Sequence, residues 1–413
     1  MKKNFDVIIT GAGIIGLSIA LQLARRSTLR ILVLEKGAAV GEGSTGASSA
    51  VCRFRYTLND MVALARDGIH AYRHWNEFTG LKQPAAQFQN DGVLWIPGDD
   101  RNWADAEHAR MAELNVATEV LDAAEQKERF PALSTCTVAP DLVTGEPHDC
   151  VSASRSLLEL DGGHIDPAAA AQDLVDACRA RGVEVRFRAR VSEIETSDSG
   201  IRAVLLEDGS RIPAQLLINA AGPWCNDLYR AAGLDSGWDL VPTRIQVLYL
   251  DCPESVPGNI PVSVDFQGGI YFRTQNRGRQ LVVGSVLEDD EKEAVADPDH
   301  FNRLHDDDFM YTKLHALSHR IPRLPNRGQV RGYCGLYTVN RDDIHPIVGK
   351  TAVDGFWVAN GFSGHGFKLA PAIGSMMARA ITGASSEFDT DVPIDFFAVD
   401  RRPIDIAMKS VLA

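Results

Sequence analysis

Three glycines near the start of the sequence have the spacing of a turn that binds phosphate groups. Gly11, Gly13 and Gly16 follow the apolar run 7–9. From Ile14 onward, a helix formed by the sequence would be apolar on nearly every face. This pattern predicts a buried strand, a tight turn and a buried helix. Gly11 would permit the turn, Gly13 would let a pyrophosphate approach the helix N-terminus, and Gly16 would let the helix pack closely on the strand.

An acidic residue ends the next predicted strand. The apolar run 30–34 is followed directly by Glu35, whose carboxylate can accept a hydrogen bond from a ribose 2′-hydroxyl and would repel a 2′-phosphate. Strand, glycine turn, helix, strand and acid in this order predict a dinucleotide site. They disfavour NADP and leave both FAD and NAD open.

A second glycine turn, GFSGHGFK at 361–368, lies near the other end of the sequence. It follows the apolar strand expected at 356–359 and opens a helix expected over 368–381. Such a turn directs free N–H groups and the positive end of the helix dipole at whatever lies beyond it. Lys368 opposes that dipole, so it is either a functional cation or a surface lysine whose ammonium reaches solvent. His365 could tune a bound cofactor or could simply bond to the turn backbone.

Two segments of small residues follow other predicted strands. Residues 37–58 are rich in Gly, Ser and Ala and carry Arg53 and Arg55, which fits either a ligand-lining loop or a flexible surface loop. Two residues apart on an extended chain, both arginines point the same way, so the sequence does not decide which of them clamps a carboxylate. The strand within 215–224 runs into Ala-Ala-Gly-Pro, which also permits close approach to a cofactor.

Composition narrows the class of protein. The 413 residues carry a net charge of −13, which argues against a nucleic-acid partner. No apolar run reaches the roughly 18 residues of a membrane span, and a first strand expected from about residue 4 leaves no room for a signal peptide. The seven cysteines show no C-x-x-C pair, and the histidines show no metal-ligand spacing. We therefore expect reduced thiols, a cytoplasmic location and no metal.

The order of patterns predicts an α/β fold with two interleaved domains. A Rossmann-like cofactor domain is expected from residues 1–84, 151–235 and 331–413. A substrate domain, inserted as residues 85–150 and 236–330, is expected to form a large mixed or antiparallel sheet.

Four blocks together resemble the FAD-dependent D-amino acid oxidase (DAO) superfamily. They are the N-terminal glycine turn, GSTGASSAVCRFR at 43–55, INAAGPW at 218–224 and GFSGHGFKLAP at 361–371. Their resemblance is greatest to the branch with sarcosine oxidase and the sarcosine and dimethylglycine dehydrogenases, and it covers nearly the whole chain. It implies FAD rather than NAD. It also implies oxidation of the C–N bond of a small amino acid or secondary (N-alkyl) amine, by hydride transfer to flavin N5 and hydrolysis of the imine.

The resemblance further implies which residues form the site. Those expected at the cofactor are Gly11, Gly13, Ile14, Ile15, Gly16, Glu35, Lys36, Ser44, Thr45, Val191, Ala220, Gly222, Trp224, Gly335, Gly361, Gly364, His365, Gly366, Phe367 and Lys368. Those expected to act on the substrate side are Lys368 and Arg53 or Arg55 as the carboxylate clamp, with His365 and Tyr337.

Three positions depart from particular members of the superfamily. Tyr337, in GLYT, stands where D-amino acid and glycine oxidases carry a carboxylate-binding arginine, and it fits the sarcosine oxidase branch. Gly335 stands where monomeric sarcosine oxidase attaches its flavin through a cysteine, with Cys334 one residue earlier, so we expect non-covalent FAD. Val282 replaces an oxygen-activating lysine, which favours a dehydrogenase or an oxidase that uses another cation.

Two alternatives stay open. The chain could be an FAD-binding subunit or assembly factor of a larger electron-transfer complex with little activity alone, or a D-amino acid oxidase or dehydrogenase. An intact Lys368 with Arg53 or Arg55 favours an enzyme, because a purely structural flavoprotein needs no carboxylate clamp. The electron acceptor is either O2 or an unidentified carrier.

Overall fold

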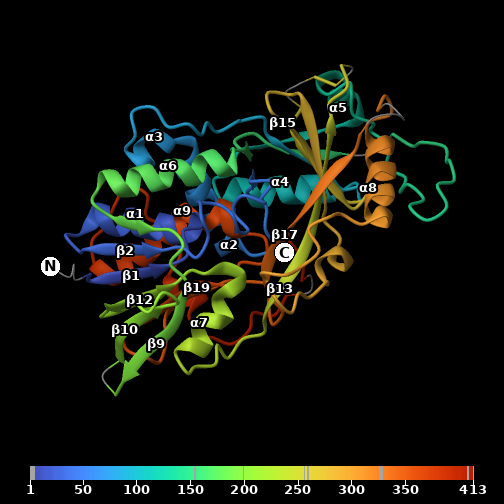
Figure 1. The fold of residues 1–413 in the computed structure, drawn as a ribbon. Helices are drawn as coiled ribbons and strands as arrows, with labels where there is room; N and C mark the ends of the chain where they lie inside the picture. Colours follow the sequence, from blue (N-terminus) through green and yellow to red (C-terminus); the bar gives the residue numbers. More distant parts are fainter. Residues whose placement is uncertain are drawn as a thin grey trace.

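The computed structural model describes residues 5–152, 155–198, 200–254, 256–257, 260–324, 329–406 and 409–412. Two sheets organise this part of the chain, one at each side of the view in Figure 1. No helix of the described residues combines the length and the apolar character needed to cross a lipid bilayer.

The first sheet has six strands and carries the N-terminal glycine turn. Its order is β18 (Ile347–Lys350), β19 (Phe356–Asn360), β12 (Leu216–Asn219), β1 (Val7–Thr10), β2 (Ile31–Leu34) and β8 (Glu184–Arg186). All neighbours are parallel except the β18–β19 pair. Consecutive side chains of a strand point to opposite faces, so both faces of this apolar sheet must be covered.

Helices cover one face of this sheet and a small sheet covers the other (Figure 1). Val7 and Ile9 of β1 pack in the cluster that contains α1 (Ile14–Arg26), α6 (Pro167–Ala180) and α9 (Gly366–Thr382). Ile8, between them, packs in a second cluster. This cluster includes α7 (Cys225–Ala231) and the antiparallel strands β9 (Val191–Ser197), β10 (Gly200–Leu206) and β11 (Arg211–Pro213).

The second sheet has eight strands and is mixed. Its order is β17 (Arg331–Asn340), β13 (Leu240–Asp251), β16 (Gln280–Ser285), β15 (Ile270–Gln275), β14 (Val262–Asp265), β4 (Val93–Ile96), β6 (Ser156–Glu159) and β5 (Thr118–Leu121). Only β14 and β4 pair in parallel. Helix α8 (Asp307–Arg320) packs on one face, and α4 (Trp103–Glu113) packs on the other. The predicted α/β fold with a large mixed sheet is confirmed.

The remaining elements of the described residues belong to neither of these two sheets. They are β3 (Val51–Cys52), α2 (Asn59–Arg73), α3 (Trp75–Thr79), α5 (Ala123–Arg129), β7 (Gly163–His164) and the 3-10 turns η1 (Gly222–Trp224), η2 (Glu288–Glu291) and η3 (Ile394–Phe397). Two strands expected in the cofactor domain, β6 and β17, pair instead with the eight-stranded sheet. We therefore propose that the domain division follows the two sheets, with these strands moved to the second.

Candidate active site

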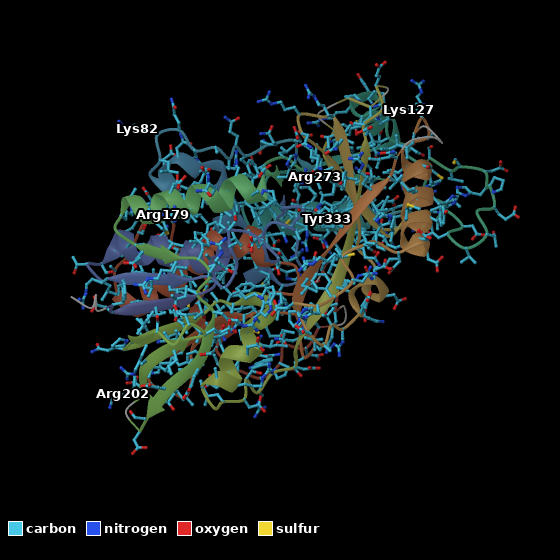
Figure 2. The ribbon with its side chains drawn as sticks, viewed as in Figure 1. Lys82, Lys127, Arg179, Arg202, Arg273 and Tyr333 are labelled. Atoms are coloured by element: carbon cyan, nitrogen blue, oxygen red, sulfur yellow. The ribbon has the colours of Figure 1, made fainter. Side chains whose placement is uncertain are left out.

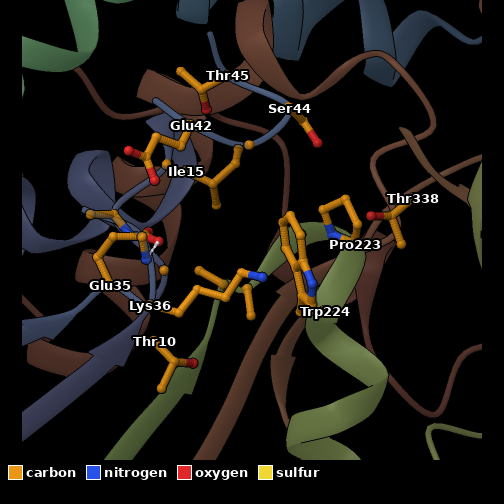
Figure 3. A pocket seen from close by; sticks show the side chains of 18 of the residues that line it. Thr10, Ile15, Glu35, Lys36, Glu42, Ser44, Thr45, Pro223, Trp224 and Thr338 are labelled. Atoms are coloured by element: carbon orange, nitrogen blue, oxygen red, sulfur yellow. Dashed lines mark hydrogen bonds between the residues drawn. The ribbon is translucent and has the colours of Figure 1, made fainter. Parts of the chain in front are cut away.

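A cavity of about 590 Å³ lies at the ends of the parallel strands where the glycine turn leaves β1. Its walls come from seven chain segments, 10–15, 34–37, 41–45, 188–191, 206–208, 220–224 and 361–364, with further single residues and pairs. Figure 3 shows side chains from several of these segments facing one another across the space. Ligands of open α/β sheets bind at this end of the strands.

The glycines of the first turn are required by close packing. Gly11 has a φ of +101°, and a Cβ there would lie 2.4 Å from the carbonyl oxygen of Ala220. A Cβ on Gly16 would lie 2.1 Å from the carbonyl oxygen of Gly11, so this residue packs α1 against the turn and does not line the cavity. Gly13 lines the cavity, and a Cβ there would meet only the Thr45 hydroxyl, at 3.2 Å.

The N-terminus of α1 and Glu35 form one polar wall. Ile14 N donates to the Thr45 hydroxyl at 3.0 Å, and the two Glu35 oxygens accept from Ala12 N at 2.9 Å and Gly37 N at 2.7 Å. First-turn N–H groups lack acceptors inside a helix, and Gly13 has no side chain to cap them. A carboxylate has about four lone-pair sites, so Glu35 keeps acceptor capacity for a sugar hydroxyl.

Residues from the second sheet's connections close the opposite wall. Asp299 accepts hydrogen bonds from Lys36, from Arg190 at 2.8 Å and from the Trp224 indole at 3.1 Å. The Lys36 ammonium lies 3.7 Å from the centre of a Trp224 ring. Figure 3 shows the Lys36 side chain pointing toward this indole. Despite the desolvation of Asp299, the bonds from Lys36 and Arg190 lower the pKa of its carboxyl. Sequence reasoning did not find Asp299 or Arg190, because no local motif marks them.

The C-terminal glycine turn packs against Tyr337 on β17. Gly364 has a φ of +82°, and a Cβ there would lie 2.5 Å from the Tyr337 ring. Tyr337 and Thr338 both line the cavity, so the edge strand of the second sheet reaches the ligand space. Burial raises the pKa of Tyr337 well above its usual value, so the phenol stays protonated.

Behind this turn, Lys368 and His365 lie in a buried polar group with Tyr56 and Arg53. The ammonium of Lys368 lies 5.8 Å from the centre of the Tyr56 ring, and the Arg53 guanidinium lies 4.3 Å from the same centre. Within the described residues, no hydrogen bond or ion pair reaches the Lys368 ammonium, and no carboxylate pairs with Arg53. Burial and the charge of Arg53 lower the pKa of Lys368 well below its usual value.

Other polar atoms of this group also lack partners. In the described part of the chain, the two ring nitrogens of His365 make no hydrogen bond, and neither does the Tyr56 hydroxyl. Burial and the charges of Lys368 and Arg53 lower the pKa of His365 well below its usual value. Unsatisfied buried polar atoms cost free energy, and their concentration here indicates a place for a bound group.

The two arginines have different surroundings. Arg55 lies 4.0 Å from the Glu107 carboxylate, and its guanidinium is 5.5 Å from the rings of Trp95 and Trp103. Burial lowers the pKa of Arg55 to about 10. Among the described residues, the hydrogen-bond acceptors of Arg53 are the carbonyl oxygens of Arg55 and Val411. The carboxylates of Glu159 and Glu291 act on its charge without forming an ion pair with it in this part of the chain.

The last described residues cover both arginines. The carbonyl of Val411 accepts from Arg53, and that of Leu412 accepts from Arg55 at 3.1 Å. Val411 N donates to Glu291 at 3.0 Å, and burial raises the pKa of that carboxyl to about 8. The C-terminal residues therefore occupy the acceptor positions that a carboxylate would take.

Another buried cation, Arg273 on β15, lies near Tyr333 (Figure 2). It donates to the carbonyl of Ser49 at 2.9 Å. Burial lowers the pKa of Arg273, and Figure 2 shows surface residues such as Lys82 and Arg202 extending outward instead.

Most of the expected cofactor residues come together at the cavity. Those that line it are Gly11, Gly13, Ile14, Ile15, Glu35, Lys36, Ser44, Thr45, Val191, Ala220, Gly222, Trp224, Gly361, Gly364, Gly366 and Phe367, with Tyr337. Those that do not are Gly16, Gly335, His365 and Lys368, with the two arginines. Gly335 packs elsewhere, because a Cβ there would lie 2.6 Å from the Cβ of Ala47.

A family model described as DAO, FAD dependent oxidoreductase, matches residues 6–380. The chain belongs to this family. FAD dependent oxidoreductase domain-containing protein 1 of Xenopus laevis is 26% identical, with 92% of this chain and 79% of that protein covered. Human peroxisomal sarcosine oxidase is 27% identical (94% and 95% covered), and rat mitochondrial dimethylglycine dehydrogenase is 26% identical (94% and 44% covered).

The fold comparison agrees with the family. The structure of L-proline dehydrogenase from P. horikoshii superposes with a TM-score of 0.80 at 22% identity, covering 97% of this chain and 98% of that one. The cytoplasmic location stays a prediction, because the relatives include a mitochondrial and a peroxisomal protein.

FAD is the cofactor that the family implies, and the cavity fits it. Gly13, which has no side chain, leaves room for a phosphate at the start of α1, and Glu35 lies on the adjoining wall with acceptor capacity to spare. At the other end, the 361–364 turn places glycines on the wall, with the unpartnered His365 behind them.

Proposed function

We propose that this family member oxidises the C–N bond of a small amino acid or secondary amine that carries a carboxylate. One observation carries the proposal: Lys368 and Arg53 are buried cations that share one aromatic neighbour and have no carboxylate partner among the described residues. Burying an unpaired charge is costly, so such a pair is retained where a ligand supplies the anion. Among the ligands compatible with this family, a substrate carboxylate is that anion.

The two cations would fix the substrate through one carboxylate. Arg53 offers a planar fork that matches two carboxylate oxygens, and Lys368 offers a point charge from the neighbouring helix. The arriving anion would raise the pKa of Lys368 and so stabilise its ammonium form. The fixed side chain of Tyr56, against which both cations lie, would keep them in position.

The same charges would prepare the amine. Nearby cations disfavour a second positive charge, so Lys368 and Arg53 would lower the pKa of the substrate ammonium and favour the neutral amine. The chemistry that bound FAD supplies is acceptance of a hydride from the carbon beside that nitrogen, after which the imine hydrolyses. No residue of this chain is needed to abstract a proton from carbon.

The substrate class is supported by the relatives and by Tyr337. Two relatives are named for dimethylglycine and sarcosine, both N-methyl amino acids. At the cavity wall, Tyr337 is a neutral phenol, so it adds no second carboxylate clamp there. A D-amino acid oxidase or dehydrogenase is therefore the less favoured substrate alternative. The electron acceptor is proposed as O2 or a carrier still to be identified.

We also propose that FAD is bound without a covalent link. Gly335 has no side chain to attach it, and the neighbouring Cys334 is buried with its thiol donating to the carbonyl of Leu304 at 3.2 Å. Acid precipitation of the purified protein should leave the flavin in the supernatant. Flavin that stays with the pellet would contradict this.

One observation favours a second candidate, an FAD-binding subunit or assembly factor with little activity alone. Val411 and Leu412 take up hydrogen bonds from both arginines, so a substrate carboxylate has to displace them. A subunit regulated by a partner would need such a cover. Activity of the isolated chain separates this candidate from the first.

The test is anaerobic reduction of the bound flavin by a panel of amines. Carboxylated secondary amines, D-amino acids and amines without a carboxylate are mixed with the purified protein, and loss of flavin absorbance is followed. The expected result is bleaching by a carboxylated secondary amine that is lost in Lys368→Met and kept in the control Lys82→Met, whose lysine is exposed. Bleaching only by amines without a carboxylate would overturn the clamp, and no bleaching by any compound would favour the second candidate.

A further inference from the structure

Four side chains with metal-binding atoms come together on the second sheet, and none of them lines the cavity. Cys136, His148 and Cys150 lie in the connection between α5 and β6, and His319 lies in the last turn of α8. One ligand atom from each of the four lies within 4.8 Å of every other. In Figure 1 this connection forms the teal loop beside the orange α8.

The distances match the edges of a zinc coordination tetrahedron. The Nε2 atom of His148 lies 3.3 Å from Cys136 Sγ, 3.8 Å from Cys150 Sγ and 3.3 Å from Nε2 of His319. Tetrahedral zinc, with bonds of about 2.3 Å to sulfur and about 2.05 Å to nitrogen, requires edges of about 3.3 Å between nitrogens and about 3.6 Å between sulfur and nitrogen. The observed contacts bracket these values.

Hydrogen bonds alone do not explain the arrangement. The Nε2 atom of a neutral imidazole has either one hydrogen or one lone pair, so it can make one good hydrogen bond. Here three separate groups converge on the single Nε2 atom of His148. A cation at the centre of the four atoms would satisfy all of them at once, because each would direct a lone pair at it.

The surrounding contacts hold the ligands in place without any ion. Arg320, next to His319, forms a fully buried ion pair with Asp265 at 2.9 Å and donates to the carbonyl of Cys136 at 3.2 Å. Across the loop, Thr137 N donates to the carbonyl of Val151 at 2.8 Å, which ties the Cys136 end to the Cys150 end. Both ends of the ligand set are therefore tied to the sheet, through the Arg320 side chain and the backbone bond between Thr137 and Val151.

The connection has no regular secondary structure of its own. Residues 130–152, all of them described, contain no helix and no strand. A loop of this length in a compact domain is unusual and needs packing or a cross-link to be ordered. A metal bound by three of its residues and by α8 is such a cross-link.

We propose that Cys136, His148, Cys150 and His319 bind one structural zinc ion that ties this loop to α8. Two thiolates and two imidazoles neutralise and suit Zn²⁺, and four protein ligands leave no open position for a reacting molecule. The exposed Cys150 gives solvent access for loading and for chelators. The ion holds the loop against α8, which packs on the second sheet, and it takes no part in amine oxidation.

The test is metal analysis of protein purified without a polyhistidine tag after growth with zinc. One zinc per chain is expected in the wild type, with loss to background in Cys136→Ser and His319→Gln. Matched controls are Cys252→Ser, a half-buried thiol elsewhere, and His315→Gln, one turn earlier on α8 and outside the cluster. Both controls should keep the zinc.

A second measurement needs no variant. Replacing zinc by Co²⁺ in the wild type should give the intense red-region absorption of tetrahedral cobalt, at longer wavelengths than flavin absorbs. Wild-type protein without stoichiometric metal, variants that keep it, or a Cys136–Cys150 disulfide in freshly prepared protein would each overturn the proposal.

Discussion

Lys368 and Arg53 are buried beside an aromatic ring and carbonyl oxygens. The buried carboxylate of Glu159 interacts with both charges, but no ion pair to it is formed among the described residues. A helix position or a motif can mark such a lysine in a sequence, as the GFSGHGFK block did. It cannot show that the ammonium is unpaired, because this depends on what every other segment brings near it. The choice between Arg53 and Arg55 was open for the same reason, since Glu107 comes from α4.

The depressed pKa of Lys368 predicts how stability depends on pH. In the unfolded chain Lys368 titrates normally, near 10.5, whereas in the substrate-free fold its pKa lies well below this value. Between these two values the unfolded state binds more protons, so unfolding becomes harder as pH rises, by up to about 1.4 kcal/mol per pH unit for one group. Denaturant unfolding at several pH values should show wild type gaining stability relative to Lys368→Met as pH rises through this window. Parallel pH profiles for the two proteins would contradict the buried, unpaired ammonium.

The two arginines should separate in kinetics and stability. Arg53→Ala is expected to lower kcat/KM for a carboxylated amine by about thirtyfold or more, because truncating one partner of a buried charge pair costs about 2 kcal/mol or more. Arg55→Ala should act mainly on stability, since this side chain packs near Trp95 and Trp103 and faces Glu107. Steady-state kinetics and thermal melting of both variants check this. A larger kinetic loss in Arg55→Ala would exchange the two roles.

At the scale of elements, local sequence patterns predicted the positions of helices and strands, which depend mainly on interactions between residues close in the sequence. The helix expected over 368–381 is found as α9, 366–382, and the strand expected at 356–359 is found as β19, 356–360. Asp299 shows the limit, because its place at the cavity depends on Arg190 and Trp224, which are 109 and 75 residues away. The C-terminal residues show the same limit, because the hydrogen bond from Arg53 to Val411 joins residues that are 358 positions apart in the sequence.

Removing that C-terminal cover should change substrate affinity. Without residues 409–413, the hydrogen bonds from Arg53 and Arg55 to Val411 and Leu412 are gone, and a substrate carboxylate no longer competes with them. The bond to Arg53 is the one that competes with the substrate, and a net hydrogen bond to a charged group contributes about 1.5 kcal/mol, so KM should fall about tenfold with kcat little changed. Kinetics of the shortened chain give the measurement. An unchanged KM with a lower melting temperature would mean that the segment only packs against Trp95.

At the scale of the whole molecule, alternating patterns predicted two interleaved units, and strand pairing is the basis on which we propose different limits for them. β6 and β17 read locally like any other strand, but their hydrogen-bonded neighbours are β4, β5 and β13. The Cys–His cluster escaped prediction for a related reason. Cys136, His148 and Cys150 share no familiar ligand spacing, and the fourth ligand candidate, His319, joins them only because α8 packs under the loop.

Because both sheets contribute to one cavity, FAD should stabilise the entire described fold rather than one domain. The glycine turn and Glu35 belong to the first sheet, whereas Tyr337 and Thr338 belong to the second and Asp299 to its connections. A ligand that binds only the folded state adds about 4 kcal/mol at a thousandfold excess over its Kd. Stripping the flavin should therefore lower the melting temperature of a single transition, and added FAD should restore it, as scanning calorimetry can record. Two transitions, of which FAD moves only one, would mean that the second sheet folds independently of the cavity it helps to close.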